Sequence, residues 1–378
     1  MTRGGNVRHL YVHLPFCSHR CGYCDFVTAL GRHGEHDAYV GALVAELEHE
    51  AAWLDRELET AFVGGGTPTF TEPAALARLL SALPVVGELT VEANPETVTP
   101  ELARLLREHG VTRVSLGAQS FRPALLQVLE RQATADDVRR AVHTLRDAHF
   151  DNISLDLIYG IPGQSAADLA ADLDDALALE PEHLSCYELE AKPGTRFTHA
   201  HGAELERQAE AMEGYAELVV ETLSGAGYRW YETANFCRDG VRDVRAQHNL
   251  AIWRGADYLG IGVGAVSTLA MERRRNFPSV GRYVAALEDG DVPPREMEHL
   301  DPTTRAVERL MLGLRLDEPL PLAALQEEAG PGGRSVLDGA ALERLARRGL
   351  VELDPGTIRL TPRGRLLGGA VTAELLAA

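Results

Sequence analysis

The 378-residue sequence lacks a disulfide framework. Of its five cysteines, three fall within residues 17–24, while Cys186 and Cys237 stand far apart. Small disulfide-stabilised secreted proteins show a different distribution, and this one indicates a metal site in a reducing compartment. We take Cys186 and Cys237 as ordinary buried thiols. The cysteines therefore predict a cytoplasmic protein.

The sequence also lacks positive charge and long apolar runs. Its 37 Lys and Arg residues against 56 Asp and Glu residues give a net charge of −19. Proteins that bind nucleic acids rely on many Lys and Arg contacts to phosphate, so we expect no nucleic-acid partner. Residues 1–14 show no apolar signal-peptide core, and the Gly-rich run 258–271 is too short to cross a bilayer. We expect a protein that is not integral to a membrane.

Short apolar segments alternate with amphipathic helical patterns through about the first 230 residues. The predicted strands are 10–14, 61–63, 89–93, 111–116, 153–158 and 184–189, and helical patterns lie at 40–54, 135–148 and 166–179. Thr99 and Pro100 suit the start of another helix. This order predicts an α/β fold with a parallel sheet covered by helices. Periodicity alone leaves open whether the sheet is doubly wound or a partial barrel.

The pattern becomes irregular and aromatic after residue 228, and it changes again near residue 301. Two helices at 305–314 and 340–348 and a hairpin around 354–356 resemble a small α+β winged helix, a shape used in DNA binding. Arg344, Arg347 and Arg348 hint at a basic helix, but the acidity of the chain favours a packing role. We expect three parts: 1–235, 236–300 and 301–378.

Cys17, Cys21 and Cys24 form the pattern C-x₃-C-x₂-C directly after the first predicted strand. Thiolates hold iron–sulfur clusters, and three of them leave the fourth iron of a cubane open to a chelating ligand. The alternative is zinc, which needs a fourth ligand such as His13 or His19. A redox dithiol would be a lone C-x-x-C. The spacing favours the cluster.

Isolated polar groups follow the next strands. The glycine loop 64–66, with Thr67 behind it, follows the second strand. The other polar groups are Glu92, Gln119, Arg131 and Asp156. The carboxyl ends of the strands meet at one end of a barrel, so these groups can line one cofactor there. Carboxylates suit hydroxyl groups of that cofactor, and an arginine suits a carboxylate.

The segment YVHLPFCSHRCGYCDF (11–26) resembles the radical S-adenosylmethionine (SAM) family of oxygen-independent coproporphyrinogen III oxidase and its paralogue, the heme chaperone HemW. GGGTPT, VEANPE, SLGAQSF, LERQ and DLIYGIPGQ follow in that family's order. The resemblance covers nearly the whole chain. It implies a partial (β/α)₆ radical SAM barrel with a small C-terminal winged-helix-like domain, and a [4Fe–4S] cluster on the three cysteines. The SAM contacts that it implies are Tyr11, Tyr23, Gly65, Gly66, Thr67, Glu92, Gln119, Arg131 and Asp156.

Two departures from the oxidase match the heme chaperone. The oxidase carries a fourth cysteine two residues after the third, where this chain has Phe26, and it has a longer segment before the first strand than the about nine residues here. The segment HNLAIW (248–253) resembles the HNxxYW heme-binding motif, with Ile252 in place of Tyr. The resemblance implies that heme binds at His248, with Trp253 and the glycine loop 260–264 as an apolar wall. Without the resemblance, a histidine buried by packing would be the preferred interpretation of His248.

The leading hypothesis is a heme chaperone that delivers heme to acceptor apo-hemoproteins, including membrane-associated respiratory enzymes, on a scaffold that retains the cluster and SAM. The alternative is a radical SAM oxidoreductase acting on a tetrapyrrole. Coproporphyrinogen oxidase activity is not expected. A DNA-binding regulator is a remote third hypothesis.

Overall fold

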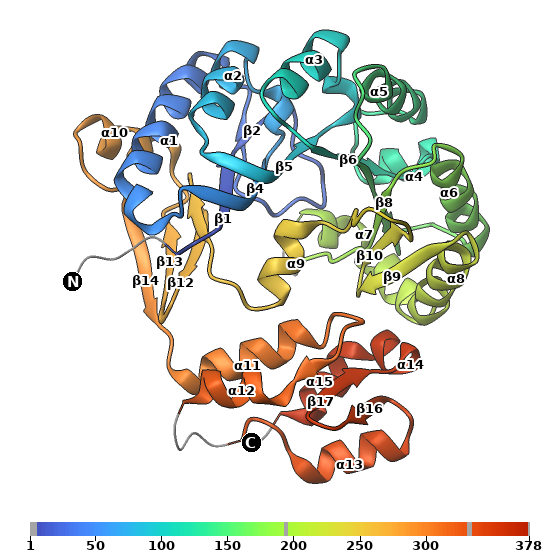
Figure 1. Ribbon diagram of the computed structural model, residues 1–378. Coiled ribbons are helices and arrows are strands. Elements are labelled where there is room, and N and C mark those ends of the chain that lie inside the picture. Colours follow the sequence, from blue (N-terminus) through green and yellow to red (C-terminus); the bar gives the residue numbers. More distant parts are fainter. Residues whose placement is uncertain (1–5, 193–195, 331–334, 377–378) are drawn as a thin grey trace.

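A computed structural model describes residues 6–192, 196–330 and 335–376. Six parallel strands lie side by side in one nine-stranded sheet (Figure 1). They are β1 (His9–Leu14), β4 (Glu57–Gly65), β5 (Val85–Ala93), β6 (Arg113–Gln119), β7 (Ile153–Tyr159) and β8 (His183–Glu188). These are the six predicted strands. The sheet curves as a partial barrel, which confirms the expected fold class.

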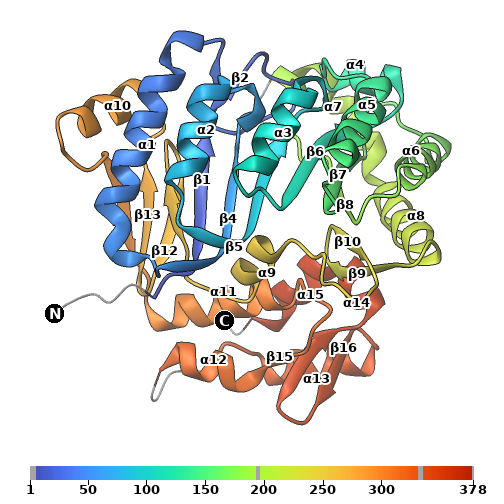
Figure 2. The same ribbon diagram turned by 45° about the horizontal axis from the view of Figure 1, so that its top comes forward.

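Helices cover the outer face of this sheet, as Figures 1 and 2 show. They are α1 (His36–Glu50), α2 (Pro73–Ala82), α3 (Pro100–Glu108), α5 (Ala135–Asp147), α6 (Ala166–Ala178) and α8 (Met212–Gly225). The Thr99 side chain accepts a hydrogen bond from the Leu102 amide, so it caps α3 as predicted. Thr134 and Ser165 form capping boxes at the starts of α5 and α6.

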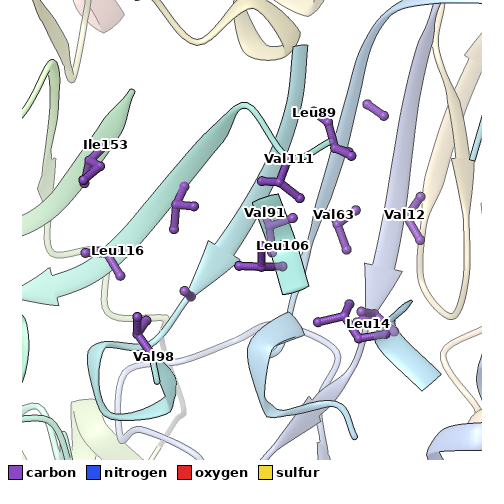
Figure 3. Packing of buried hydrophobic residues seen from close by; sticks show 14 of the residues in the cluster. Val12, Leu14, Val63, Leu89, Val91, Val98, Leu106, Val111, Leu116 and Ile153 are labelled. Atoms are coloured by element: carbon purple, nitrogen blue, oxygen red, sulfur yellow. The ribbon is translucent and has the colours of Figure 1, made fainter. Parts of the chain in front are cut away.

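The two faces of the sheet differ in chemistry because successive strand residues point to opposite sides. The outward residues are apolar and pack under the helices; Figure 3 shows Val12, Val63, Val91, Leu116 and Ile153 among them. The inward residues are mostly polar, yet many are buried. They include His9, Thr60, Thr90, Ser154 and His183. The barrel interior is therefore a polar space that must satisfy its own hydrogen bonds or hold a ligand.

The segment after residue 228 is more regular than its sequence pattern indicates. β9 (Tyr228–Glu232) and β10 (Asn235–Arg238) extend the sheet beyond β8, while β11 (Leu259–Ile261) pairs in parallel with β1 at the other edge. A separate sheet holds β12 (Val266–Leu269), β13 (Glu272–Asn276) and β14 (Arg295–His299). These strands have at most five residues each, too few to show a period. The helices here are α9 (Gln247–Trp253) and α10 (Val280–Glu288).

The C-terminal part is a small α+β domain with its own apolar core, in which Leu310, Leu325, Leu345 and Ile358 are buried. Its elements follow the order of a winged helix: α11 (Pro302–Gly313), β15 (Leu320–Pro321), α12 (Leu322–Ala329), α13 (Gly339–Arg347), β16 (Val351–Asp354) and β17 (Thr357–Leu360). Two short helices follow, α14 (Pro362–Leu366) and α15 (Gly368–Leu375). Within the described ranges, no helix combines the length and apolarity that a membrane crossing requires.

Candidate functional site

A pocket of about 330 Å³ opens at the carboxyl ends of the barrel strands. It brings together the cysteine segment, the glycine loop after β4 and the ends of β5, β6, β7 and β8. The predicted site residues that line it are Cys17, Cys21, Tyr23, Cys24, Gly65, Gly66, Thr67, Glu92, Gln119, Arg131 and Asp156. Segments far apart in sequence thus meet as expected for a parallel barrel.

The cysteine segment is held by bonds to several elements. β2 (Phe16–Cys17) pairs with β3 (Ala29–Leu30), and the cysteine loop runs between them. Cys17 Sγ lies 3.4 Å from Thr67 Oγ1, and Arg131 Nη1 donates to Cys21 Sγ at 3.5 Å. The Gly22 amide donates to the Leu129 carbonyl at 3.2 Å. The three thiols are therefore positioned before any metal binds.

The thiol geometry bears on which metal group fits. A single tetrahedral zinc ion places its sulfur ligands about 3.8 Å apart. Among the described His, Cys, Asp and Glu residues, the group whose ligand atoms all lie within 4.8 Å of one another is His33, His36 and Glu72, and the three thiols do not form such a set. His13 is also occupied, because its ring nitrogens bond Tyr11 Oη and the Val27 carbonyl. Wider spacing suits thiolates that bind separate irons of a cluster.

Burial changes the acidity of the cysteine loop. It raises the pKa of Cys17 to about 11, while the Thr67 hydroxyl lowers that pKa in part. Burial also raises the pKa of Cys24. Both thiols are thus protonated at neutral pH without a metal. Metal binding must displace these protons, so assembly of the site is coupled to proton release.

The glycine loop approaches the cysteine segment more closely than side chains allow. Gly65 has a φ of +117°, a conformation that L-residues rarely adopt, and its amide donates to Glu92 Oε2 at 3.0 Å. A Cβ atom added at Gly66 would lie 2.6 Å from the Pro15 carbonyl oxygen. The loop therefore presents backbone, not side chains, to the pocket beside Cys17.

Arg131 is the centre of a hydrogen-bond network at the pocket. Its Nη2 donates to Asn94 Oδ1 at 2.9 Å and to the Gly117 carbonyl at 2.7 Å, while Asn94 Nδ2 donates to Thr67 Oγ1 at 3.1 Å. Arg131 Nε is buried without a hydrogen-bond partner. That free donor suits a carboxylate. Asn94 is not among the site residues predicted from the sequence, although it directly follows the third predicted strand within VEANPE.

Gln119 and the two carboxyl groups complete the lining. Gln119 has a φ of +65° at a register shift of β6, a strained conformation found at functional sites. Burial raises the pKa of Glu92 to about 7; the Gly65 amide lowers it and the charge of Asp156 raises it further. Burial also raises the pKa of Asp156, whose oxygens accept from Ser115 Oγ at 3.0 and 3.2 Å. These acids can accept hydrogen bonds from ligand hydroxyls.

Tyr11 is not among the residues that line this pocket, and the SAM contact that the resemblance implies for it stays a prediction. Its hydroxyl bonds His13 Nδ1 at 3.0 Å, and its ring stacks on Phe62 with centroids 6.1 Å apart. Tyr11 lies in the middle of β1, before the β2 strand that carries Cys17. In this structure Tyr11 supports His13, which in turn holds the cysteine loop through Val27.

His248 lies at the other end of the barrel interior, near the beginnings of β1, β4 and β5. It is 2 % exposed, and its Nδ1 is 2.8 Å from Thr60 Oγ1. Its ring meets His9 edge-on at 6.5 Å. Burial, and then the proximity of His9, lower the pKa of His248 to about 3, so it is neutral. It presents no exposed face to a ligand in this conformation.

The predicted heme wall is not assembled around His248. Trp253 follows five residues later on the short helix α9, about 140° around its axis, and lies beside Tyr231 with ring centroids 6.4 Å apart. Gly260 and Ile261 belong to β11, and the Gly262 amide donates to the buried Glu46 carboxylate at 2.8 Å. These groups are occupied by packing within the fold. Heme ligation by His248 stays a prediction, and this conformation does not place the predicted wall around its ring.

Comparisons with known proteins agree with this site. The Radical SAM superfamily model matches residues 11–176, and the HemN C-terminal domain model matches residues 300–367. The chain is 33% identical to the heme chaperone HemW of Bacillus subtilis, over 98% of this chain and 99% of that protein. The chain belongs to the HemW family of radical SAM proteins. HemW of Mycobacterium tuberculosis is 36% identical over 97% of this chain and 94% of its own length.

An oxidase and a solved structure are also similar to this chain. The oxygen-independent coproporphyrinogen III oxidase of Pseudomonas aeruginosa is 30% identical to this HemW relative, over 97% of this chain and 84% of the oxidase. The structure of the Escherichia coli coproporphyrinogen III oxidase HemN superposes with a TM-score of 0.81 at 23% identity, over 98% of this chain and 90% of that one. The fold of barrel and C-terminal domain is therefore shared.

Proposed function

We propose that this protein is a heme chaperone that binds heme in the cytoplasm and delivers it to apo-hemoproteins, including membrane-associated respiratory enzymes. The observation that carries the proposal is the cysteine loop. The oxidase pattern has a fourth cysteine where this chain has Phe26, which is 61 % exposed at the pocket. Near-full-length relatives named heme chaperone HemW support the same conclusion.

The pocket residues fit a [4Fe–4S] cluster and SAM. Cys17, Cys21 and Cys24 would hold the cluster, since each lines the pocket and none is in a disulfide. The buried Arg131 Nε, which has no partner, would bind a carboxylate of SAM, and Glu92 would accept from its hydroxyls. When bound, the pair supplies one-electron chemistry at this site. Arg131 orients the ligand, and the glycine loop 64–66 lets it approach the cysteines.

A second candidate function is a radical SAM oxidoreductase acting on a tetrapyrrole. It is favoured by one observation, because the pocket keeps the full polar lining that cofactor chemistry needs. The oxidase relative at 30% identity is consistent with it. The absence of a fourth thiol from the loop weighs against it.

One anaerobic experiment separates the two functions. The protein is reconstituted with iron and sulfide, and one portion is titrated with heme while another receives coproporphyrinogen III, SAM and a reductant. We expect saturable heme binding with a defined Soret band and no protoporphyrinogen formation. Catalytic turnover of coproporphyrinogen III would instead establish the oxidoreductase. A protein that neither binds heme nor turns over would refute the chaperone proposal.

A further inference from the structure

A second cavity lies outside the barrel, between its outer face and the C-terminal domain. Its volume is about 540 Å³, within the range of about 300–1,000 Å³ typical of small-molecule sites. One side is formed by α8 and the strands β8, β9 and β10, and the other by α11, α14 and α15. Figures 1 and 2 show α8 and α14 facing each other across this junction. The cavity is separate from the cysteine pocket, with which it shares only Glu188.

The walls of this cavity are largely apolar and partly flat. Trp230 and Phe236 on the paired strands stack with their planes 12° apart and their centroids separated by 6.2 Å. From α8 come Met212, Ala216 and Val219, spaced so that one helical face lines the cavity. Such walls suit a flat apolar ligand, because aromatic rings stack in offset, parallel arrangements.

Within these apolar walls lies one buried cation, Arg365. It is 7 % exposed, its Nη1 donates to the Trp230 carbonyl at 2.7 Å, and its guanidinium lies 3.7 Å from the centre of the Trp230 ring. Its Nε and Nη2 are buried with no hydrogen-bond partner. Burial lowers the pKa of Arg365 to about 10, so it remains charged at neutral pH.

The acids near Arg365 are already engaged elsewhere. Asp317 accepts from Arg229 at 2.7 and 2.9 Å, and Glu232 accepts from Arg315 at 2.6 Å. The acids that line the cavity itself, Glu188 and Glu213, are solvent-exposed, so they belong to its rim. A buried guanidinium with two unused donors is costly to leave unpaired. A ligand carboxylate would satisfy both donors in the fork geometry that arginine prefers.

We infer that this cavity binds a flat apolar ligand through a carboxylate held by Arg365. The identity of the ligand rests on the proposed function: heme has an apolar macrocycle and propionate carboxylates, so the cavity is a heme site with one propionate on Arg365. The macrocycle lies against Trp230 and the apolar face of α8. The site differs from the His248 segment, which is closed in this structure.

The test compares two ligands and four variants of the full-length reconstituted protein. Heme dimethyl ester lacks free carboxylates but keeps the macrocycle and the iron. We expect the wild type to bind heme about tenfold to a hundredfold more tightly than the ester. The difference corresponds to the charge-assisted hydrogen bonds between Arg365 and a propionate, which the ester cannot form. Arg365→Gln should weaken heme binding by a similar factor and leave ester binding unchanged. Arg347→Gln, at an exposed position, is the matched control.

A second pair of variants tests the cavity without touching the arginine. Gly369 lines the cavity, and a Cβ atom there would meet no atom within 4 Å. Gly369→Trp should therefore fill the space and weaken the binding of both ligands at least tenfold, whereas Gly369→Ala should bind both as the wild type does. Thermal unfolding of each variant checks that the C-terminal domain remains folded.

The outcomes separate this inference from the proposed function. If the wild type binds heme but Arg365→Gln and Gly369→Trp both retain its affinity for heme, the site is wrong while the chaperone function stands. If the wild type binds no heme, the proposed function fails and the identity of the ligand fails with it. Loss of the preference for free carboxylates in Arg365→Gln alone supports the site.

Discussion

The two ends of the barrel interior are built from similar polar side chains, but they differ in what their pockets expose. We call the carboxyl ends of the strands, where the three thiols line the pocket, the open end. The opposite end, where a pocket of about 660 Å³ beside α9 leaves His248 covered, is called the closed end. At the carboxyl ends of the strands, Glu92 and Asp156 line a pocket together with the three thiols. At the opposite end, Thr60 bonds both His9 and His248, at 3.0 and 2.8 Å, beneath α9. Buried donors without a partner occur at both ends, Arg131 Nε at the open end and Arg113 Nε at the closed end.

This difference concerns His248, the residue of the heme-binding motif. His248 has the right chemistry and the right sequence context for a heme ligand, yet α9 is anchored over the barrel. Glu88 accepts from the amides of Gln247 and His248 at 2.9 and 3.4 Å, which fixes the start of this helix. Experiments on cluster content, on stability and on SAM affinity test the two ends separately.

The largest effect is expected at the open end. Replacing Cys21 by Ala should abolish the cluster, because a loop with two thiolates cannot hold three irons of a cubane. Anaerobically reconstituted wild type should contain about four irons and four sulfides per chain. Cys237→Ala, which removes a buried thiol in β10, is the control and should keep the full content. Stoichiometric zinc without sulfide in the wild type would contradict the cluster.

The closed end predicts a dependence of stability on pH. The pKa of His248 is about 3 in the folded protein and about 6.5 in an unfolded chain. As pH falls below about 6.5, the unfolded chain binds a proton that the folded protein excludes. The free energy of unfolding should therefore drop by about 1.4 kcal/mol per pH unit from this group, or about 2 kcal/mol at pH 5. The contribution is fully present above pH 6.5.

Urea denaturation at pH 7 and pH 5 measures this effect. His248→Gln should lose less stability on acidification than the wild type, by about 2 kcal/mol. His49→Gln replaces an exposed histidine and serves as the matched substitution. Equal losses in the wild type and in His248→Gln would show that His248 is not held as a buried neutral imidazole.

A smaller effect is expected from Glu92 at the open end. Its pKa of about 7 means that the carboxylate, which accepts hydrogen bonds from ligand hydroxyls, is largely lost by pH 6. SAM affinity should fall about tenfold from pH 8 to pH 6, following the ionised fraction. Glu92→Gln should bind SAM more weakly at pH 8 and lose this pH dependence. If calorimetry shows the same SAM affinity at pH 8 and pH 6 in the wild type, Glu92 does not bind SAM through its carboxylate.

The sequence predicted the parts of the molecule that depend on local pattern. The six parallel strands follow from apolar runs between helices, and the cysteine loop follows from the spacing of Cys17, Cys21 and Cys24. The Arg365 cavity could not be predicted, because Trp230 and Arg365 come together only by packing between the barrel and the C-terminal domain. The sequence could not decide between a ligand role and burial for His248, because its burial depends on Thr60 in a distant strand.

A transfer experiment tests whether this HemW relative both binds heme and delivers it. The reconstituted protein is loaded with one equivalent of heme, separated from free heme, and mixed with apomyoglobin while the Soret band is followed. We expect the Soret band to shift to that of holomyoglobin as the protein loses its heme. Heme that is never taken up in the loading step, or that stays on the protein when apomyoglobin is added, would contradict heme delivery.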